Sequence, residues 1–371
     1  MTSRIRLQPV RRSRLAEVDP DNLGFGSVYA DHMFSMVYRD GAWRDPEIVP
    51  YGPIPIEPAA CALHYGQAVF EGLKAFRGVD ARLRLFRPDR NLERLTSSCE
   101  RLCIPPPGAS IFDEAVRSLV ALDEAWIPRG EGEALYIRPL IFSDEPQLEV
   151  RPSTRYRFLI MTSPVRNYYG GAFTTVALRA ERRSTRAAPG GLGEAKTGGN
   201  YAASLLPGEL ARAEGYHQVL WLDAAEHRYV EEVGQMNIFF RFRDRVVTPL
   251  LSGTILPGVT RESVIRLLAD RGVAVEERRI AIDEVAAAAR SGGLVEAFGA
   301  GTAAVISPVG RIAWDDEVVE INGNLAGDLT RALHEEITGI QTGRVADRHG
   351  WTVTVDPRAE RVPALGAGSR G

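Results

Sequence analysis

Lysine is almost absent from this chain. Of its 371 residues, 45 are lysine or arginine, and only Lys74 and Lys196 among them are lysines. A lysine amine can form a Schiff base with an aldehyde, whereas an arginine guanidinium stays protonated and cannot. Two lysines kept among so many arginines are therefore the first candidates for a chemical role.

Cysteine, metal-ligand spacings, excess charge and long apolar runs are scarce as well. The three cysteines form no CxxC pair and the six histidines no HExxH motif, so we expect neither a disulfide framework nor a metal site. A net charge of −3 gives no general attraction to nucleic acid or to an anionic membrane. No apolar run reaches the roughly 18 residues of a membrane span. These absences predict a cytoplasmic protein that binds neither nucleic acid nor membrane.

Basic residues are concentrated at the N-terminus, where five arginines precede the first acidic residue, Glu17. Such a segment is compatible with a transit peptide, with a basic arm that binds an anionic partner, or with a solvated tail. It lacks an apolar stretch and is only weakly amphipathic, which favours the solvated tail.

The length predicts about two domains. We expect a partly disordered N-terminal extension at residues 1–30 and a small domain at 31–166. A turn-forming cluster indicates that the linker and the start of the large domain occupy residues 167–180. The rest of the large domain is expected at 181–355, followed by a disordered tail at 356–371.

Local patterns predict the elements of these domains. Pro88 precedes an apolar stripe of helical spacing, and the apolar run at 158–161 has the length of a strand. The second half of the chain contains three strand-like segments joined by short turns and two helix-like segments, so an α+β domain with an antiparallel meander is expected there. The strand-like segments are residues 218–223, 227–233 and 237–242, and the helix-like segments are residues 261–271 and 282–291.

Lys196 lies in a glycine-rich segment, residues 190–201. Glycines on both sides allow a ligand to approach the backbone closely and leave the amine accessible. A phosphate-binding P-loop requires glycine directly before its Lys-Thr pair, but Ala195 stands there, so the nucleotide-site interpretation fails. Two interpretations remain for this segment: a mobile surface loop, or a lysine that forms a Schiff base.

Three further segments are candidates for ligand binding. Glu231 and Glu232 follow each other on a predicted strand, so only one of them can face a site. A buried carboxylate there would keep a pyridine nitrogen protonated, although such a pair can also be plain surface charge. Residues 256–260 lead into a helix, and residues 298–303 form a glycine turn. Both could hold an anion through backbone N–H groups or be simple turns, and Arg101 could add positive charge.

Five segments, in this order along the chain, closely resemble the branched-chain-amino-acid aminotransferases, which are fold-type IV pyridoxal-phosphate enzymes. They are HYGQAVFEGLK (residues 64–74), YIRP (136–139), KTGGNY (196–201), EVGQMN (232–237) and FGAGT (298–302). The resemblance spans residues 31–341. It implies an α+β fold with a smaller N-terminal α/β domain and a larger C-terminal pseudo-barrel domain that binds pyridoxal 5'-phosphate. It also implies a homodimer in which the partner subunit completes the active site.

The resemblance assigns roles to the cofactor-binding residues. Lys196 corresponds to the Schiff-base lysine, which also carries the proton between the substrate Cα and the cofactor. Glu232, and not Glu231, corresponds to the acid that pairs with the pyridine nitrogen, and Tyr201 to the residue that hydrogen-bonds the phenolic oxygen. The residues that match the family's phosphate site are Arg101, Val259, Thr260 and Thr302.

Substrate-binding residues follow from the same resemblance. Thr302, Ala303 and Tyr136 would meet the substrate α-carboxylate, and Arg138 would accept the distal carboxylate of glutamate. Aromatic residues would wall the side-chain pocket, and residues of the partner subunit would complete it. The wall residues are Tyr29, Phe70 and Tyr168, and the positions contributed by the partner are Tyr65, Leu148 and Val150. Gln235 beside the substrate and Glu149 in the dimer loop depart from the family pattern and leave the substrate range open.

The implied activity is transfer of the amino group of leucine, isoleucine or valine to 2-oxoglutarate, so the small-molecule partners are amino acids and 2-oxo acids. Two alternatives stay open. The chain could act on another substrate with the same fold, as a D-amino-acid transaminase or an aminodeoxychorismate lyase. It could instead be a non-enzymatic protein that binds an anion or RNA through its arginine-rich N-terminus.

Overall fold

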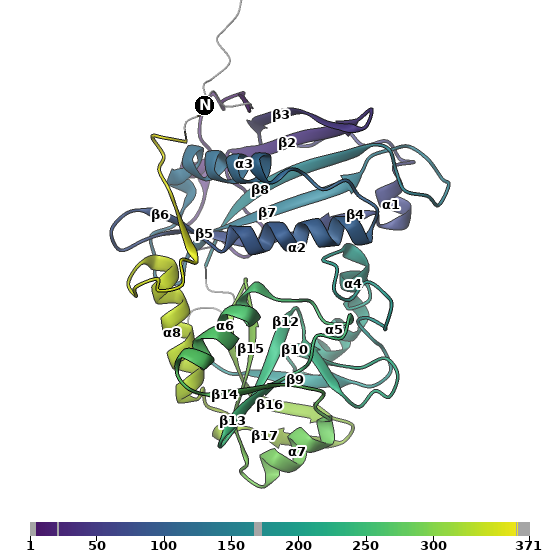
Figure 1. Ribbon diagram of the computed structural model, residues 1–371, viewed down its shortest axis with the longest axis vertical. Helices are drawn as coiled ribbons and strands as arrows, with labels where there is room; N and C mark the ends of the chain where they lie inside the picture. Colours follow the sequence, from purple (N-terminus) through teal and green to yellow (C-terminus); the bar gives the residue numbers. More distant parts are fainter. Residues whose placement is uncertain (1–4, 21, 167–172, 361, 363–371) are drawn as a thin grey trace, which may run out of the picture. The chain divides into compact units, whose positions relative to one another are not determined.

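The structure is a computed structural model that describes residues 5–20, 22–166, 173–360 and 362 (Figure 1). The chain divides into two compact units. The first unit consists of Met1–Tyr168 together with Gly339–Gly371, and the second unit is Tyr169–Thr338. Within the described residues, no helix is both long and apolar enough to span a membrane.

A nine-stranded sheet forms the first unit, and its described strand pairs are antiparallel apart from the parallel pair β1–β3. The strand order is β1-β3-β2-β8-β7-β5-β6-β18, and β4 pairs with β7. The strands are β1 (Arg6–Leu7), β2 (His32–Arg39), β3 (Ala42–Pro50), β4 (Ala68–Phe70), β5 (Leu73–Arg77), β6 (Leu83–Phe86), β7 (Ala134–Ser143), β8 (Tyr156–Val165) and β18 (Thr352–Val355). The strand predicted at residues 158–161 is confirmed as part of β8.

Two helices, α2 (Pro88–Arg101) and α3 (Ala109–Leu122), pack together against this sheet (Figure 1). The predicted helix that begins at Pro88 is confirmed as α2, because the fixed φ of proline suits the first turn of a helix. Leu95 and Cys99 of its apolar stripe are fully buried. Shorter helical turns of this unit are α1 (Cys61–Tyr65) and the 3₁₀ turns η1 (Leu15–Glu17) and η2 (Glu124–Trp126), whereas the 3₁₀ turn η3 (Asn322–Asn324) belongs to the second unit.

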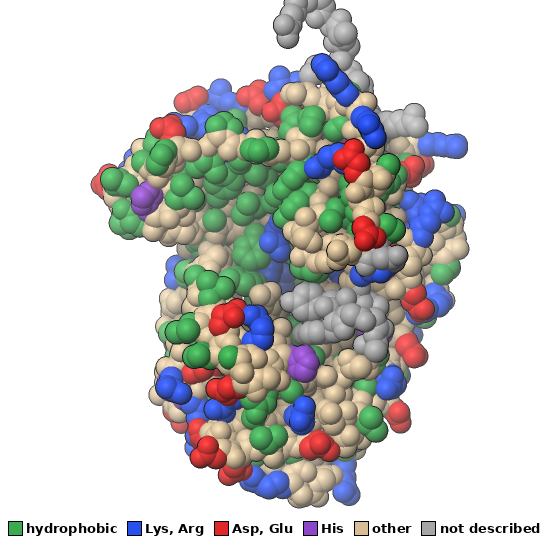
Figure 2. Space-filling model, turned by 180° about the vertical axis from the view of Figure 1, so that it is seen from behind, with side chains coloured by type: hydrophobic (Ala, Val, Ile, Leu, Met, Phe, Trp, Pro, Cys, Tyr) green, Lys and Arg blue, Asp and Glu red, His purple; other side chains and the backbone are tan. Residues whose placement is uncertain are grey.

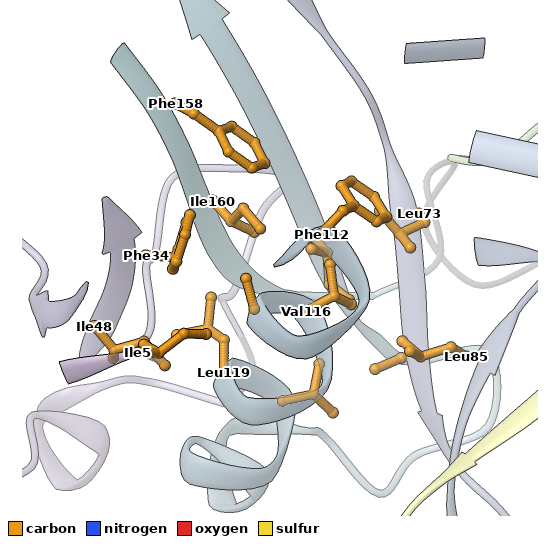
Figure 3. Close-up of a cluster of buried hydrophobic side chains, with 14 of the residues drawn as sticks. Ile5, Phe34, Ile48, Leu73, Leu85, Phe112, Val116, Leu119, Phe158 and Ile160 are labelled. Atoms are coloured by element: carbon orange, nitrogen blue, oxygen red, sulfur yellow. The ribbon is translucent and has the colours of Figure 1, made fainter. Parts of the chain in front are cut away.

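The core of the first unit lies between α3 and the sheet. Figure 3 shows Phe112 and Val116 of α3 grouped with Phe34, Phe158 and Ile160 of the strands. Each of these side chains is at most 2% exposed. Burying one such side chain stabilises a fold by about 1.5–3 kcal/mol, so this cluster holds α3 onto the sheet.

The arginine-rich N-terminal segment is packed against the first unit, contrary to the expected solvated tail. β1 pairs with β3, and Ile5 and Leu7 on either side of Arg6 are 2% and 6% exposed. Apolar residues that alternate with arginine form one buried face of an edge strand. The expectation of a solvated tail considered the many arginines of this segment and not the apolar residues that alternate with them.

The C-terminal part of the chain also belongs to the first unit, although the sequence predicted a large domain that continues to residue 355. α8 (Asp328–Thr342) leads out of the second unit, and β18 then pairs with the edge strand β6. This pairing satisfies backbone groups of β6 that would otherwise be exposed at the sheet edge. Glu360 forms an ion pair with Arg117, which holds the start of the tail that was expected to be disordered at 356–371.

The second unit is built on a nine-stranded sheet that closes on itself. The strand order is β11-β10-β9-β16-β15-β12-β13-β14, with β17 paired to β16, and an additional β11–β12 pairing closes the ring from β11 to β12 into a barrel. The strands are β9 (Val176–Glu181), β10 (Gln218–Leu222), β11 (Val230–Val233), β12 (Met236–Phe242), β13 (Arg245–Thr248), β14 (Ala274–Glu277), β15 (Leu294–Gly301), β16 (Val305–Trp314) and β17 (Glu317–Glu320). The predicted pseudo-barrel and the antiparallel meander of β10, β11 and β12 are confirmed.

Besides α8, the described part of the second unit contains four α-helices. They are α4 (Gly198–Ala202), α5 (Leu205–Ala213), α6 (Val259–Asp270) and α7 (Ile282–Arg290). The helices predicted at 261–271 and 282–291 are confirmed as α6 and α7. Both contact β15, and fully buried side chains of both helices, such as Val264 and Val285, anchor them to the barrel.

Candidate active site

Lys196 lies in a glycine loop that packs tightly against the second unit. A Cβ at Gly193 would lie 2.4 Å from the backbone oxygen of Thr254, so only glycine fits there. Asn200 closes the loop, since its amide donates to the carbonyls of Leu192 and Ala195 at 2.8 Å each. The loop that carries Lys196 is therefore held in place by specific contacts, which does not fit the alternative of a mobile surface loop.

The amine of Lys196 is paired with a phenol. Its Nζ donates to the Tyr201 hydroxyl at 2.7 Å, and Lys196 itself is only partly buried. Tyr201 lies in α4, which begins two residues after the lysine. The glycines of this segment allow the chain to turn from the loop into α4, so that a lysine and a tyrosine five residues apart face each other.

Glu232 is a buried carboxylate on β11 with several stabilising partners. Its side chain is 4% exposed, and its Oε1 accepts hydrogen bonds from the Leu256 N–H at 2.7 Å and the Asn237 amide at 3.3 Å. Arg186 Nε lies 2.9 Å from its Oε2. Donors and a guanidinium around a buried carboxylate stabilise its negative charge.

Glu231, the neighbouring acid, has different surroundings. It accepts from the Thr254 hydroxyl and lines a separate cavity of about 320 Å³ together with Tyr229 and Ile255. Burial raises the pKa of Glu231, and the nearby charge of Glu232 raises it further. The two acids therefore face different parts of the second unit, as strand geometry predicted.

Asn237 connects Glu232 to the start of α6. Its amide donates to Glu232 and, at 2.9 Å, to the Leu256 carbonyl. A Cβ at Gly258 would lie 2.1 Å from the Asn237 side-chain oxygen, so glycine is required directly before α6. The next two residues, Val259 and Thr260, open α6, where backbone N–H groups have no acceptor within the helix.

The end of β15 lies beside the same asparagine. Asn237 is the strand neighbour of Ala300, and a Cβ at Gly301 would lie 3.0 Å from Met236. Thr302 and Ala303 follow in the turn after β15, and both are partly exposed. The glycine turn, the start of α6 and Glu232 are thus arranged around one short segment of β12.

A small pocket of the second unit brings several of these residues together. It is lined by five of the residues described above together with Gln235, which lies in the β11–β12 turn. Its lining residues are Arg186, Asn200, Tyr201, Ser204, Glu232, Gly234, Gln235 and Leu256. A phenol, a buried carboxylate, an adjacent lysine amine and a helix start form the donor set that pyridoxal 5'-phosphate requires, so the residues fit this cofactor.

In the first unit, Tyr136 and Arg138 lie on β7 and are joined directly. Arg138 donates to the Tyr136 hydroxyl at 2.9 Å, and its guanidinium lies 4.7 Å from the centre of the Phe70 ring. Arg138 Nε is buried and has no hydrogen-bond acceptor among the described residues. An unsatisfied buried donor on a guanidinium is suited to receive a ligand carboxylate.

Gly72 sets the position of Tyr136. A Cβ at Gly72 would lie 2.1 Å from the Tyr136 hydroxyl. The preceding residue, Glu71, is fully buried, and Arg94 of α2 binds both of its oxygens, at 2.7 and 2.8 Å. This buried pair fixes the turn between β4 and β5 that carries Gly72.

The remaining candidates of the first unit are spread over several segments. Tyr29 stacks on Tyr51 with ring centres 4.5 Å apart. Tyr65 ends α1, is 44% exposed, and donates to the Leu148 carbonyl at 2.6 Å. Arg101 is the last residue of α2. Tyr168 lies outside the described residues.

Sequence reasoning missed Arg186, Asn237 and Gly72. Nothing distinguishes Arg186 from the other arginines along the chain, and its pairing with Glu232 depends on the fold. Asn237 and Gly72 lie inside two of the motifs, but their roles require knowing which backbone segments approach them.

Comparison with known proteins agrees with this arrangement. The family model of class IV amino-transferases matches residues 68–312. The chain is 52% identical over 338 residues to branched-chain-amino-acid aminotransferase 2 of Bacillus subtilis (strain 168), an alignment that covers 91% of this chain and 93% of that protein.

Solved structures are similar as well. The branched-chain amino acid aminotransferase of Escherichia coli is 28% identical, with a TM-score of 0.72, over 88% of this chain and 99% of that one. A branched-chain amino acid aminotransferase of T.th., solved with pyridoxamine 5'-phosphate, is 28% identical, with a TM-score of 0.73, over 86% of this chain and 98% of that one. This chain therefore belongs to the class IV aminotransferases.

Proposed function

We propose that this protein is a pyridoxal-phosphate-dependent transaminase that moves the amino group of leucine, isoleucine or valine to 2-oxoglutarate. The observation that carries the proposal is the 2.7 Å contact between Lys196 Nζ and the Tyr201 hydroxyl, with Tyr201 and the buried Glu232 lining one pocket. When bound, pyridoxal 5'-phosphate supplies an electron sink for the charge that develops at the substrate Cα.

Residues of the second unit hold the cofactor in this proposal. Lys196 carries it and moves the proton at the substrate Cα, and Tyr201 donates to the phenolic oxygen. Glu232 holds a proton on the pyridine nitrogen, supported by Arg186. The phosphate is bound by backbone N–H groups and side chains that form the anion site. The residues assigned to it are Val259, Thr260, Thr302 and Arg101.

The motif residues assigned to substrate binding have separate roles in this proposal. Tyr136, together with the turn at Thr302 and Ala303, binds the α-carboxylate. Arg138 uses its free Nε donor for the distal carboxylate of 2-oxoglutarate and leaves the aliphatic side chain of leucine to the pocket walls. The aromatic walls are Tyr29 and Phe70, and Gln235 limits the size of the donor side chain that is accepted.

We also propose a homodimer, in the cytoplasm. Figure 2 shows hydrophobic side chains gathered on the surface of the first unit. Three residues of this unit that are expected to complete a partner's site are exposed: Tyr65 (44%), Leu148 (65%) and Val150 (78%). Apolar side chains of this size on a surface support a contact between copies. The cytoplasmic location is supported by the three cysteines, which are all free thiols.

The test measures amino-group transfer and identifies the lysine that binds the cofactor in the same protein preparation. Protein loaded with pyridoxal 5'-phosphate is mixed in single turnovers with L-leucine, with D-amino acids and with aminodeoxychorismate, and cofactor absorbance is recorded. We expect rapid conversion by L-leucine and recovery by 2-oxoglutarate. Borohydride reduction and peptide mapping should place the pyridoxyl group on Lys196. A label on Lys74, or turnover of D-amino acids alone, would overturn the proposal.

A further inference from the structure

The N-terminal arginine-rich segment is anchored to the start of β2, just after Tyr29. Gln8 N–H donates to the Ile48 carbonyl at 2.9 Å, which continues the β1–β3 pairing. Val10 N–H then donates to His32 Nε2 at 3.1 Å. Through these contacts the segment from Ile5 to Arg14, called the arm below, follows the surface of the first unit to the beginning of β2.

A buried histidine and aspartate hold the middle of the arm. His32 Nδ1 lies 2.7 Å from Asp123 Oδ1, and the His32 backbone N–H donates to the other oxygen of Asp123 at 3.0 Å. Because the Val10 N–H can only donate, Nε2 accepts and Nδ1 carries the proton, which fixes the neutral tautomer of His32. Both residues are at most 5% exposed, so the arm is fastened to the interior of the unit.

A second buried acid holds the end of the arm. Asp31 accepts from the Arg14 N–H at 2.9 Å and from the Trp126 indole N–H at 2.8 Å. Burial alone would raise the pKa of Asp31, but these donors and Ser13 lower it overall. The backbone of Arg14 is therefore fixed relative to residues 29–31.

The side chain of Arg14 reaches back over this segment. Its guanidinium donates to the carbonyl of Ala30 at 2.7 Å and to that of Tyr29 at 3.3 Å. It also lies 5.6 Å from the centre of the Tyr51 ring. Tyr51 in turn stacks on Tyr29, with an interplanar angle of 10°. Arg14 thus contacts both the backbone of Tyr29 and the ring on which the Tyr29 side chain rests.

The chain before Tyr29 is held by its own contacts, since Leu23 is 5% exposed and the Phe25 ring packs on Tyr136 at 5.0 Å. It contains Gly24 and Gly26, with φ angles of +62° and +74°, where glycine adopts the left-handed conformation that other residues avoid. On the other side, Ala30 N–H is fixed by the Thr162 carbonyl at 2.9 Å. Arg14 adds a hydrogen bond to the Tyr29 carbonyl, next to the fixed Ala30.

We propose that Arg14 is a positioning residue for the substrate pocket. It orients Tyr29 through the Tyr29 carbonyl and the Tyr51 ring, so that the arm sets the width of the pocket wall that meets the aliphatic side chain of the amino donor. The inference rests on the proposed function, in which Tyr29 lines that pocket. The arginine content of the arm is compatible with a targeting or anion-binding segment, but in this proposal the arm contributes to the choice of amino donor.

The test compares Arg14→Ala with Arg12→Ala. Arg12 lies in the same arm, its side chain is 80% exposed, and its described partner is Glu17 at 3.8 Å, so its replacement changes charge alone. Steady-state rates are measured with valine, leucine, isoleucine and a larger aromatic donor. We expect Arg14→Ala to raise the KM for the aliphatic donors roughly tenfold and to change kcat little. The preference for aliphatic donors over the aromatic donor, measured as the ratio of their kcat/KM values, should decrease. Arg12→Ala should match the wild type.

Two further measurements separate positioning from general stability. Tyr51→Leu should reproduce the KM change, and the Tyr51→Leu, Arg14→Ala double variant should be no worse than either single variant, because both act through Tyr29. Hydrogen exchange of the Tyr29–Tyr51 region should accelerate in Arg14→Ala protein without cofactor.

The possible results test the positioning role of Arg14 separately from the proposed transaminase activity. Wild-type protein that does not turn over leucine overturns the proposed function, and the inference with it. Active wild-type protein together with an Arg14→Ala variant that matches Arg12→Ala in KM and donor preference overturns the inference alone. A lower melting temperature of Arg14→Ala with unchanged KM overturns it as well.

Discussion

Glu231 and Glu232 are adjacent on β11, are 6% and 3% exposed, and accept hydrogen bonds from different groups, the Thr254 hydroxyl and the Leu256 N–H. They also line different cavities. Two neighbouring buried acids therefore have separate surroundings, and burial alone does not distinguish Glu232, which we propose binds the pyridine nitrogen, from Glu231. Their partners do.

Replacing each acid by glutamine tests this division. Glu232→Gln should lower kcat roughly ten- to a hundredfold, since loss of a charged hydrogen bond to the pyridine nitrogen is worth about 1.5–3 kcal/mol. Glu231→Gln should have a much smaller effect, because Glu231 pairs with the Thr254 hydroxyl and lines a different cavity. Steady-state kinetics with leucine and 2-oxoglutarate measure both. Equal losses would contradict the separation.

Arg138→Ala should separate the two half-reactions. The variant loses a guanidinium whose Nε donor is buried without an acceptor in the described structure, so the diacid substrate loses a charge-assisted contact and leucine does not. We expect the 2-oxoglutarate half-reaction to slow at least roughly tenfold more than the leucine half-reaction in single-turnover absorbance measurements. Similar slowing of both would mean that Arg138 instead supports Tyr136, to which it donates at 2.9 Å.

Gly72→Ala should impair activity through Tyr136. The new methyl would lie 2.1 Å from the Tyr136 hydroxyl, far inside van der Waals contact, so the tyrosine must move away from Arg138. We expect kcat/KM to fall for both substrates and the free energy of unfolding to drop by about 1–3 kcal/mol. Gly208→Ala in α5 is the matched control, because its methyl would meet no atom within 4 Å. It should keep activity and be stabilised slightly by helix propensity.

Lys74 gives a prediction for pH. It lies opposite Tyr136 in the β5–β7 pairing, and burial lowers the pKa of its amine from 10.5 to about 8. Between these two values the unfolded chain binds more protons than the folded one, so stability rises with pH across this window. Below about pH 8 both states are protonated and the burial penalty is fully present. We expect the difference in unfolding free energy between the wild type and Lys74→Met to shift in favour of the wild type as the pH rises from about 8 to 10.5. The shift should be on the order of 3 kcal/mol, measured by urea titration at each pH. A flat difference would contradict it.

The sequence alone predicted the local elements and the motifs. Proline at a helix start, apolar periodicity and short turns identified α2, α6, α7 and the β10–β12 meander, because these depend on neighbours within one element. The rarity of lysine and the order of five motifs singled out Lys196, Glu232 and Arg138, since each side chain is a chemical group that the reaction class requires.

Only the tertiary structure decided which distant segments meet. The pairing of β18 with β6 places the C-terminal residues in the first unit. An edge strand has unpaired backbone groups, so its partner depends on which strand the fold brings beside it. The partners of Glu232, the steric need for Gly72 and the anchoring of the arm by His32 and Asp123 all join residues far apart in the chain. Such contacts depend on three-dimensional packing and leave no periodic trace in the sequence. One arginine among many acquires its role only from the carbonyl or carboxylate that the fold places beside it.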